Sequence, residues 1–174
     1  MAALRRILSR TEIRRRVREL ADQLRADYAQ ERPVLVGCLK GAFVFLADLA
    51  RQVGIPLQVD FIMVSSYGMG TTSKGEITVL RDVTTDLMAR HVVFVDDIVD
   101  SGLTLQRVRE HLLSRGPASL RVCALLARER VLAEGVAIEY LGFPVPEGFV
   151  VGYGIDYAED YRQLPDIYVL EGEG

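Results

Sequence analysis

The chain has 174 residues, of which 49% are hydrophobic, and its formal net charge is −3 at pH 7. This length suits one domain with a full hydrophobic core, so we predict a single domain over residues 1–174. The acidic balance argues against nucleic acid as the main partner. The first ten residues contain no apolar run long enough for a signal peptide, and no segment approaches membrane-spanning length, so we expect a cytoplasmic protein.

Helical and strand-like segments alternate along the chain. Ile13, Val17, Leu20 and Leu24 recur at helical spacing and predict an amphipathic first helix, whose arginine-rich outer face we interpret as solvated. The predicted helices are 10–29 and 42–53, and the predicted strands are 34–39, 57–66 and 119–126. This alternation predicts an α/β fold, a mostly parallel sheet flanked by helices, with a ligand crevice at the carboxyl ends of the strands.

The segment 92–105 is the most informative part of the chain. An apolar strand-like run, 92–95, leads directly into the carboxylates of Asp96, Asp97 and Asp100. A short turn, 101–104, follows, and then a helix to about residue 115 that shares one apolar face through Leu105, Val108 and Leu112. An acidic turn with a helix cap would account for only one of these polar residues, so we interpret the segment as a ligand site.

The turn has the chemistry of a phosphate cradle. Gly102 allows the backbone to bend so that the N–H groups of residues 101–104 point inward, and the hydroxyls of Ser101 and Thr104 add donors. The neighbouring carboxylates of Asp96 and Asp97 suit ribose hydroxyls or a hydrated divalent cation. Three acids this close repel one another unless a cation or hydroxyls lie between them.

This order of residues resembles the phosphoribosyl diphosphate signature of the type I phosphoribosyltransferases. Three further motifs are similar to the hypoxanthine-guanine phosphoribosyltransferase branch: Lys40-Gly41 after the run 34–39, the Ser65 to Gly68 stretch, and 149–157 followed by Arg162. The resemblance extends from about residue 10 to the C-terminus. It implies the type I phosphoribosyltransferase fold, with a small irregular hood formed mainly by residues 141–174, where Pro and Gly interrupt any helical period.

The resemblance implies a glycosyltransferase of purine salvage. Such an enzyme transfers the 5-phosphoribosyl group from phosphoribosyl diphosphate to N9 of hypoxanthine or guanine, which gives IMP or GMP and diphosphate. The implied cofactor is Mg²⁺, and the implied assembly is a homodimer or homotetramer. Asp100 matches the family's general base near purine N7, a role in which a carboxylate accepts a proton.

The remaining site residues are also carried over by resemblance. The 5′-phosphate would be bound by Asp100, Ser101, Gly102, Leu103 and Thr104, the diphosphate by Lys40, Gly41 and Arg162, and the ribose by Asp96 and Asp97. The purine would be bound by Arg128, Phe149, Val150 and Asp156, and the metal by Asp96, Asp97 and Asp156. Ser66 and Tyr67 begin a polar loop, 67–78, that would close over the site as a lid. In the resembled family a cis peptide bond precedes the glycine of the diphosphate loop.

Some alternatives stay open at this point. Arg128 stands where the family usually has a lysine that contacts the 6-oxo group, which leaves the preference among hypoxanthine, guanine and xanthine undecided, and Arg130 is a second candidate for this contact. Phe149 adjoins two valines and could belong to the core. An RNA-binding regulator would rest only on the arginines of 14–18, and a transferase for adenine or uracil is the other alternative. The 149–156 motif argues against both.

Overall fold

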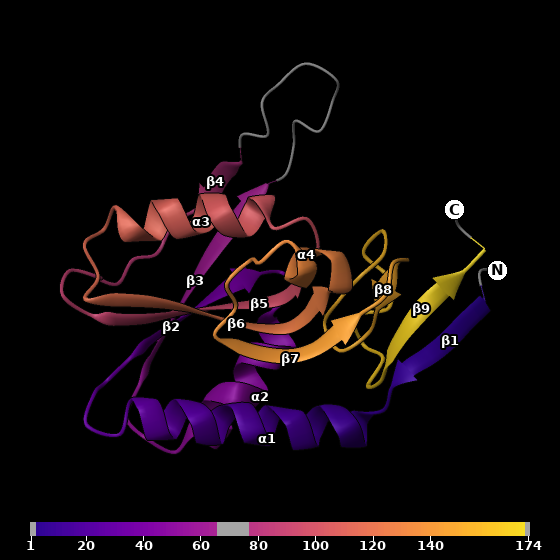
Figure 1. The fold of residues 1–174 in the computed structure, drawn as a ribbon, viewed down its shortest axis with the longest axis horizontal. Helices are drawn as coiled ribbons and strands as arrows, with labels where there is room; N and C mark the ends of the chain where they lie inside the picture. Colours follow the sequence, from indigo (N-terminus) through magenta and orange to yellow (C-terminus); the bar gives the residue numbers. More distant parts are fainter. Residues whose placement is uncertain (1–2, 66–76, 173–174) are drawn as a thin grey trace.

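A six-stranded sheet forms the centre of the computed structural model, which describes residues 3–65 and 77–172 (Figure 1). The strand order is β4-β3-β2-β5-β6-β7. The parallel strands are β2 (Val34–Leu39), β3 (Gln58–Ser65), β5 (His91–Val99), β6 (Ser119–Arg128) and β7 (Tyr140–Val145), and β4 (Thr78–Arg81) pairs antiparallel with β3 at the edge. The predicted α/β class with a mostly parallel sheet is therefore confirmed.

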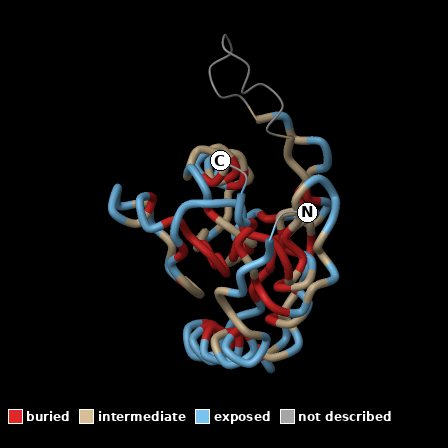
Figure 2. Tube along the Cα trace, turned by 90° about the vertical axis from the view of Figure 1, so that its right-hand side faces the viewer, coloured by how far each residue is buried: buried red, intermediate tan, exposed pale blue. Residues whose placement is uncertain are grey.

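Helices cover both faces of this sheet because its central strands are apolar on both sides. On β5, Val93 and Val95 pack with α1 (Arg10–Asp27) and α2 (Phe43–Val53), whereas Val92 and Phe94 pack with α3 (Leu103–Leu113) on the other face. Figure 1 shows α1 and α2 below the sheet and α3 above it. The short helix α4 (Glu129–Ala133) directly follows β6. Buried residues gather in the central strands, and α1 exposes its outer side (Figure 2).

The first helix begins and packs as its sequence dictates. Ser9 caps α1, and the side chain of Glu12 accepts a hydrogen bond from the backbone N–H of Ser9, which completes a capping box. The predicted apolar stripe is fully buried: Ile13, Val17, Leu20 and Leu24 are each at most 1% exposed. Within the described residues, no helix is long and apolar enough to cross a membrane.

The hood starts later in the chain than the expected residue 141, and it includes a strand from the N-terminal segment. Residues 140–145 form β7, which pairs in parallel with β6 and so belongs to the main sheet rather than to the hood. The hood is a three-stranded sheet in the order β1-β9-β8, and its edge strand β1 (Ala3–Leu8) comes from the N-terminal segment, for which the sequence predicts no strand. The other two strands are β8 (Val150–Val151) and β9 (Ile167–Glu171). Pairing of β1 with β9 therefore ties the two ends of the chain together.

Candidate functional site

The carboxyl ends of β2, β5 and β6 bring the predicted site residues to one edge of the sheet. Lys40 follows β2, Asp96 and Asp97 lie in the last four residues of β5 with Asp100 just beyond, and Arg128 is the last residue of β6. Parallel strands place such residues at the same edge, where α/β folds bind ligands. The hood segment 149–162 packs against the same edge.

The Asp96 and Asp97 side chains form an acidic pair in which each carboxylate affects the charge of the other. Asp96 is buried, and its carboxylate accepts a hydrogen bond from the backbone N–H of Asp97 at 3.0 Å. Burial raises the pKa of Asp96 well above its usual value, and the charge of Asp97 raises it further. Burial also raises the pKa of Asp97, although hydrogen bonds and the charge of Arg162 partly oppose this effect. The pair therefore favours a cation or hydroxyl donors as a ligand.

The Asp96 and Asp97 carboxylates suit Mg²⁺ as two of its ligands, with the remaining ligands coming from substrate and water. Hard oxygen ligands are what Mg²⁺ requires, and it is usually held by one or two carboxylates together with substrate phosphates and water. Among the described residues no group of three or more His, Cys, Asp or Glu side chains could hold a metal by itself. Asp156 is engaged elsewhere: it pairs with Arg162 at 2.8 Å and accepts the backbone N–H of Glu159. The arrangement suits a metal that is completed by its substrate.

We expect Asp96→Asn to stabilise the metal-free protein at neutral and alkaline pH. An ionised, buried Asp96 costs free energy, and an amide of the same shape removes that charge, so the gain should be about 0.5–2 kcal/mol, with roughly 2–4 °C in Tm per kcal/mol. Because the folded-state pKa of Asp96 is raised, the wild type becomes more stable as the pH falls, and the gain should vanish below about pH 3.9, where the carboxyl is protonated in both states.

Thermal unfolding in EDTA between pH 8 and pH 4 measures this gain. Asp22→Asn is the matched control, because Asp22 is exposed and remote from the strand ends. A lower Tm for the Asp96 variant at pH 8 would contradict the interpretation.

The loop after β2 is held in close contact with β5 and with the hood. A Cβ atom built on Gly41 would lie 1.9 Å from an Asp97 carboxylate oxygen, and one on Gly154 would lie 2.8 Å from the carbonyl oxygen of Gly41. The peptide bond between Leu39 and Lys40 is cis, in the loop where the resemblance implies one. Gly41 therefore lies between the acidic pair and the hood, where a side chain would not fit.

The two predicted diphosphate cations lie on either side of one carboxylate. Lys40 Nζ pairs with Glu159 at 3.0 Å, and Arg162 pairs with Glu159 at 3.4 Å and with Asp156 at 2.8 Å. Arg162 also donates to the carbonyl of Gly154 at 2.9 Å. Sequence reasoning missed Glu159, although its position three residues before Arg162 was a visible clue. The Glu159 carboxylate therefore shows that Lys40 and Arg162 can bind one anionic group together.

The backbone of the turn 101–104 bends at Gly102. Gly102 adopts φ +75° and precedes α3, whose N-terminus has no side-chain hydrogen-bonding cap. The only side-chain hydrogen bond recorded for this turn within the described residues is a long one of 3.4 Å, from the backbone N–H of Leu103 to Ser101 Oγ. Apart from that of Leu103, the first N–H groups of α3 have no side-chain acceptor among the described residues, which suits the binding of an anion.

The hood presents an aromatic surface to the site. Phe149 is 49% exposed, so it is not the core residue that its valine neighbours suggested. Its ring meets that of Tyr157 edge to face, with centroids 5.1 Å apart, and sequence reasoning had not singled out Tyr157. The adjacent Val150 is buried and pairs with Val169 in the hood sheet. A planar ligand could stack on the free face of Phe149.

Arg128 connects the strand-end residues to the hood. Its Nε donates to the Asp100 carboxylate at 2.7 Å, and its terminal nitrogens donate to the carbonyls of Pro146 and Gly148. Its side chain is only 8% exposed, whereas that of Asp100 is 61% exposed. The predicted lid residues Ser66 and Tyr67 lie outside the described residues.

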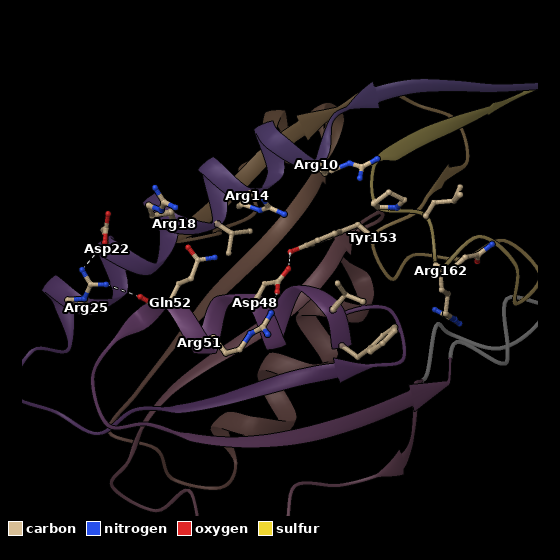
Figure 3. A pocket seen from close by; sticks show the side chains of 16 residues that line it. Arg10, Arg14, Arg18, Asp22, Arg25, Asp48, Arg51, Gln52, Tyr153 and Arg162 are labelled. Carbon is tan, nitrogen blue, oxygen red and sulfur yellow. Dashed lines mark hydrogen bonds and ion pairs between the residues drawn. The ribbon is translucent and has the colours of Figure 1, made fainter.

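A basic groove lies between α1, α2 and the hood, and it shares Arg162 with this site (Figure 3). Its volume is about 920 Å³, and its arginines are Arg10, Arg14, Arg18, Arg25, Arg51 and Arg162. Carboxylates neutralise part of this charge: Asp166 pairs with Arg10, Asp22 with Arg25, and Asp48 with Arg51. The hydroxyl of Tyr153 also donates to Asp48. This pairing agrees with a solvated arginine face on α1.

Comparison with known proteins agrees with this site. Residues 4–158 match the family model for the phosphoribosyl transferase domain. The chain is 43% identical over 167 residues to the hypoxanthine-guanine phosphoribosyltransferase of Streptococcus pneumoniae R6, covering 96% of this chain and 93% of that protein. It is 44% identical over 163 residues to the hypoxanthine phosphoribosyltransferase of Escherichia coli K12, covering 92% of each.

A solved structure shows the same fold. A hypoxanthine-guanine phosphoribosyltransferase from Bacillus anthracis superposes with a TM-score of 0.91 at 38% identity, over 98% of this chain and 99% of the other. The chain therefore belongs to the phosphoribosyltransferase family, in its hypoxanthine-guanine branch.

Proposed function

We propose that this chain is a purine salvage enzyme that transfers the 5-phosphoribosyl group from phosphoribosyl diphosphate to N9 of hypoxanthine or guanine. The products are IMP or GMP and diphosphate. The end of β5 carries the proposal: the acidic pair of buried Asp96 and partly buried Asp97, an exposed Asp100 and the N-terminus of α3 lie within eight residues, 96–103. The names of relatives that match nearly the whole chain support the same activity.

The substrate would be held at three places. The N–H groups of 101–104 and the positive end of α3 suit the 5′-phosphate, and Asp96 with Asp97 suits the ribose hydroxyls. Lys40, the Gly41 backbone and Arg162 suit the diphosphate. Because Lys40 and Arg162 both pair with Glu159, diphosphate would replace that carboxylate when it binds.

The purine would lie between the hood and Asp100. The exposed face of Phe149 offers a stacking surface, and the backbones of Val150 and Asp156 would meet the polar edge of the base. Sequence reasoning assigned the 6-oxo group to Arg128, with Arg130 as the alternative. Every guanidinium nitrogen of Arg128 already has an acceptor, and Arg130 bonds to the Asp100 carbonyl and to Glu147.

The chemical step is a displacement at C1 of the ribose. N9 of the purine forms a bond to C1 while the bond from C1 to the diphosphate oxygen breaks, and the proton on purine N7 passes to the Asp100 carboxylate. Mg²⁺ held by Asp96 and Asp97 would supply charge neutralisation for the departing diphosphate, and Asp156 would serve a second ion. Lys40 and Arg162 stabilise the same negative charge from the protein side.

The remaining assignments follow from the family. We propose that Ser66 and Tyr67 begin a loop that closes over the site and excludes water, and that the enzyme acts in the cytoplasm. We propose a homodimer or homotetramer as its assembly. A solved Trypanosoma cruzi hypoxanthine phosphoribosyltransferase, 38% identical to this chain, is described in terms of its oligomeric state.

A steady-state assay tests the proposed function. Phosphoribosyl diphosphate with Mg²⁺ is combined with hypoxanthine, guanine, xanthine or adenine, and nucleotide formation is measured. We expect turnover with hypoxanthine and guanine and rejection of adenine. Turnover with adenine alone would assign the chain to another base. No turnover with any base, together with a salt-sensitive RNA gel shift, would favour the regulator instead.

A further inference from the structure

Two arginines near the end of β6 join the Asp100 turn to the hood, and we name Arg128 and Arg130 the arginine clasp. Arg128 donates from Nε to the Asp100 carboxylate at 2.7 Å and from a terminal nitrogen to the Gly148 carbonyl at 2.7 Å. Arg130 donates to the backbone carbonyl of Asp100 at 2.9 Å and from Nε to Glu147 at 2.7 Å. Each arginine therefore bridges the same two segments.

The two arginines differ in burial. The Arg128 side chain is 8% exposed, and all three of its guanidinium nitrogens have an acceptor: the Asp100 carboxylate and the carbonyls of Pro146 and Gly148. The Arg130 side chain is 46% exposed. A buried guanidinium with a partner on every nitrogen holds those partners in its own plane, because its donors have fixed directions.

A lysine could not replace this contact. Its ammonium is a single point on a flexible stem, and it cannot span the carboxylate of Asp100 and two hood carbonyls in one plane. The hood segment held in this way ends one residue before Phe149, the proposed stacking surface for the purine. The positions of Asp100, the proposed general base, and of Phe149, the proposed stacking ring, thus both depend on the Arg128 side chain.

We infer that Arg128 is a positioning residue: it fixes the Asp100 carboxylate relative to the hood segment 146–148, and it acts on the reaction through Asp100 rather than by reading the 6-oxo group. The inference rests on the proposed function for its kinetic consequence. Its structural consequence, a fixed hood segment, holds independently of the activity.

A double-mutant cycle between Arg128 and Asp100 tests the kinetic consequence. Misplacing a catalytic group by about 1 Å can cost about 100-fold, so we expect Arg128→Ala and Arg128→Lys to lower kcat for hypoxanthine and guanine about 10- to 100-fold. The ratio of kcat/KM for hypoxanthine to that for adenine should stay unchanged. In an Asp100→Asn background, Arg128→Ala should cost less than about 3-fold, because the basic group that Arg128 positions has already been removed.

The opposite results overturn the inference. If Arg128→Ala costs as much in the Asp100→Asn background as alone, or if it narrows the gap between hypoxanthine and adenine, Arg128 reads the base directly. Full activity of Arg128→Lys would also overturn it. If Arg128→Ala does not fold, the double-mutant cycle is measured with Arg128→Lys, which keeps the positive charge. Arg121→Ala is the matched control, since Arg121 is on the same strand and pairs with Asp27 at 2.7 Å.

Amide hydrogen exchange tests the structural consequence on the free protein. We expect faster exchange at residues 147–150 in both Arg128 variants, by about 10-fold or more, and no change in Arg121→Ala. Unchanged exchange would show that Arg128 does not hold the hood segment, which overturns the inference. If the wild type turns over no purine but exchange rises as expected, the proposed function fails while the structural consequence, a hood segment fixed by Arg128, stands.

Discussion

Asp100→Asn is expected to lower kcat for hypoxanthine and guanine by about 100-fold or more, because general acid–base catalysis typically contributes 10²- to 10⁴-fold. The amide cannot accept the purine proton, but its oxygen can still accept the hydrogen bond that Arg128 Nε now donates to the carboxylate at 2.7 Å. The side chain should therefore keep its place and lose only its basicity. Substrate binding should change little, so the loss should fall on kcat rather than on KM.

Steady-state kinetics with saturating phosphoribosyl diphosphate, together with calorimetry of IMP binding, measures this split. Asp22→Asn is the matched control, because it makes the same chemical change at an exposed carboxylate on α1. The result would contradict this role if kcat for Asp100→Asn stayed within about threefold of the wild-type value. Such a loss is much smaller than a general base usually contributes, so Asp100 would not be the general base.

Gly102→Val is expected to weaken IMP binding by about 100-fold or more, below detection in a standard titration. Gly102 adopts φ +75°, which a β-branched residue takes up only with strain, and its Cβ would lie 3.3 Å from a methyl group of Val136. Relief of that strain would turn the N–H groups of 101–104 away from the phosphate. Each tenfold loss of affinity corresponds to about 1.4 kcal/mol. A modest distortion of several charge-assisted hydrogen bonds is therefore enough to produce a loss of about 100-fold.

Gly135→Val separates this effect from general destabilisation. Gly135 has a similar φ of +80° just after α4, and a Cβ there would meet nothing within 4 Å. Both variants should lose about 1–2 kcal/mol of stability from the left-handed backbone, but only Gly102→Val should lose the nucleotide. Equal IMP affinity in the two variants would show that the turn does not hold the 5′-phosphate.

The sequence by itself determined the inner strands of the central sheet and the chemical character of the site. The apolar runs at 34–39 and 92–95 lie in β2 and β5, and the stripe of Leu105, Val108 and Leu112 is the buried face of α3. These features are local: side-chain periodicity and burial act within one element, so the pattern is visible in the chain. The order of carboxylates, glycine and hydroxyls at and after the end of β5 is also local in the sequence, so it indicates a phosphate and sugar site without the tertiary structure.

Only the tertiary structure decided what depends on contacts between distant segments. β1 pairs with β9 across more than 150 residues, and β7 joins the edge of the main sheet although its Pro and Gly residues suggested irregular structure. Strand pairing depends on which edges are free once the core has packed, and the local pattern does not record this.

The same limit applies to individual side chains of the site. The sequence marked Arg128 as a departure from the family pattern and suggested a contact with the base, but its observed partners come from two segments, Asp100 and 146–148. Glu159 likewise gained its role only when the hood placed it between Lys40 and Arg162. Residue types predict which chemistry is available, whereas the packing of β5, β6 and the hood decides which charged groups meet.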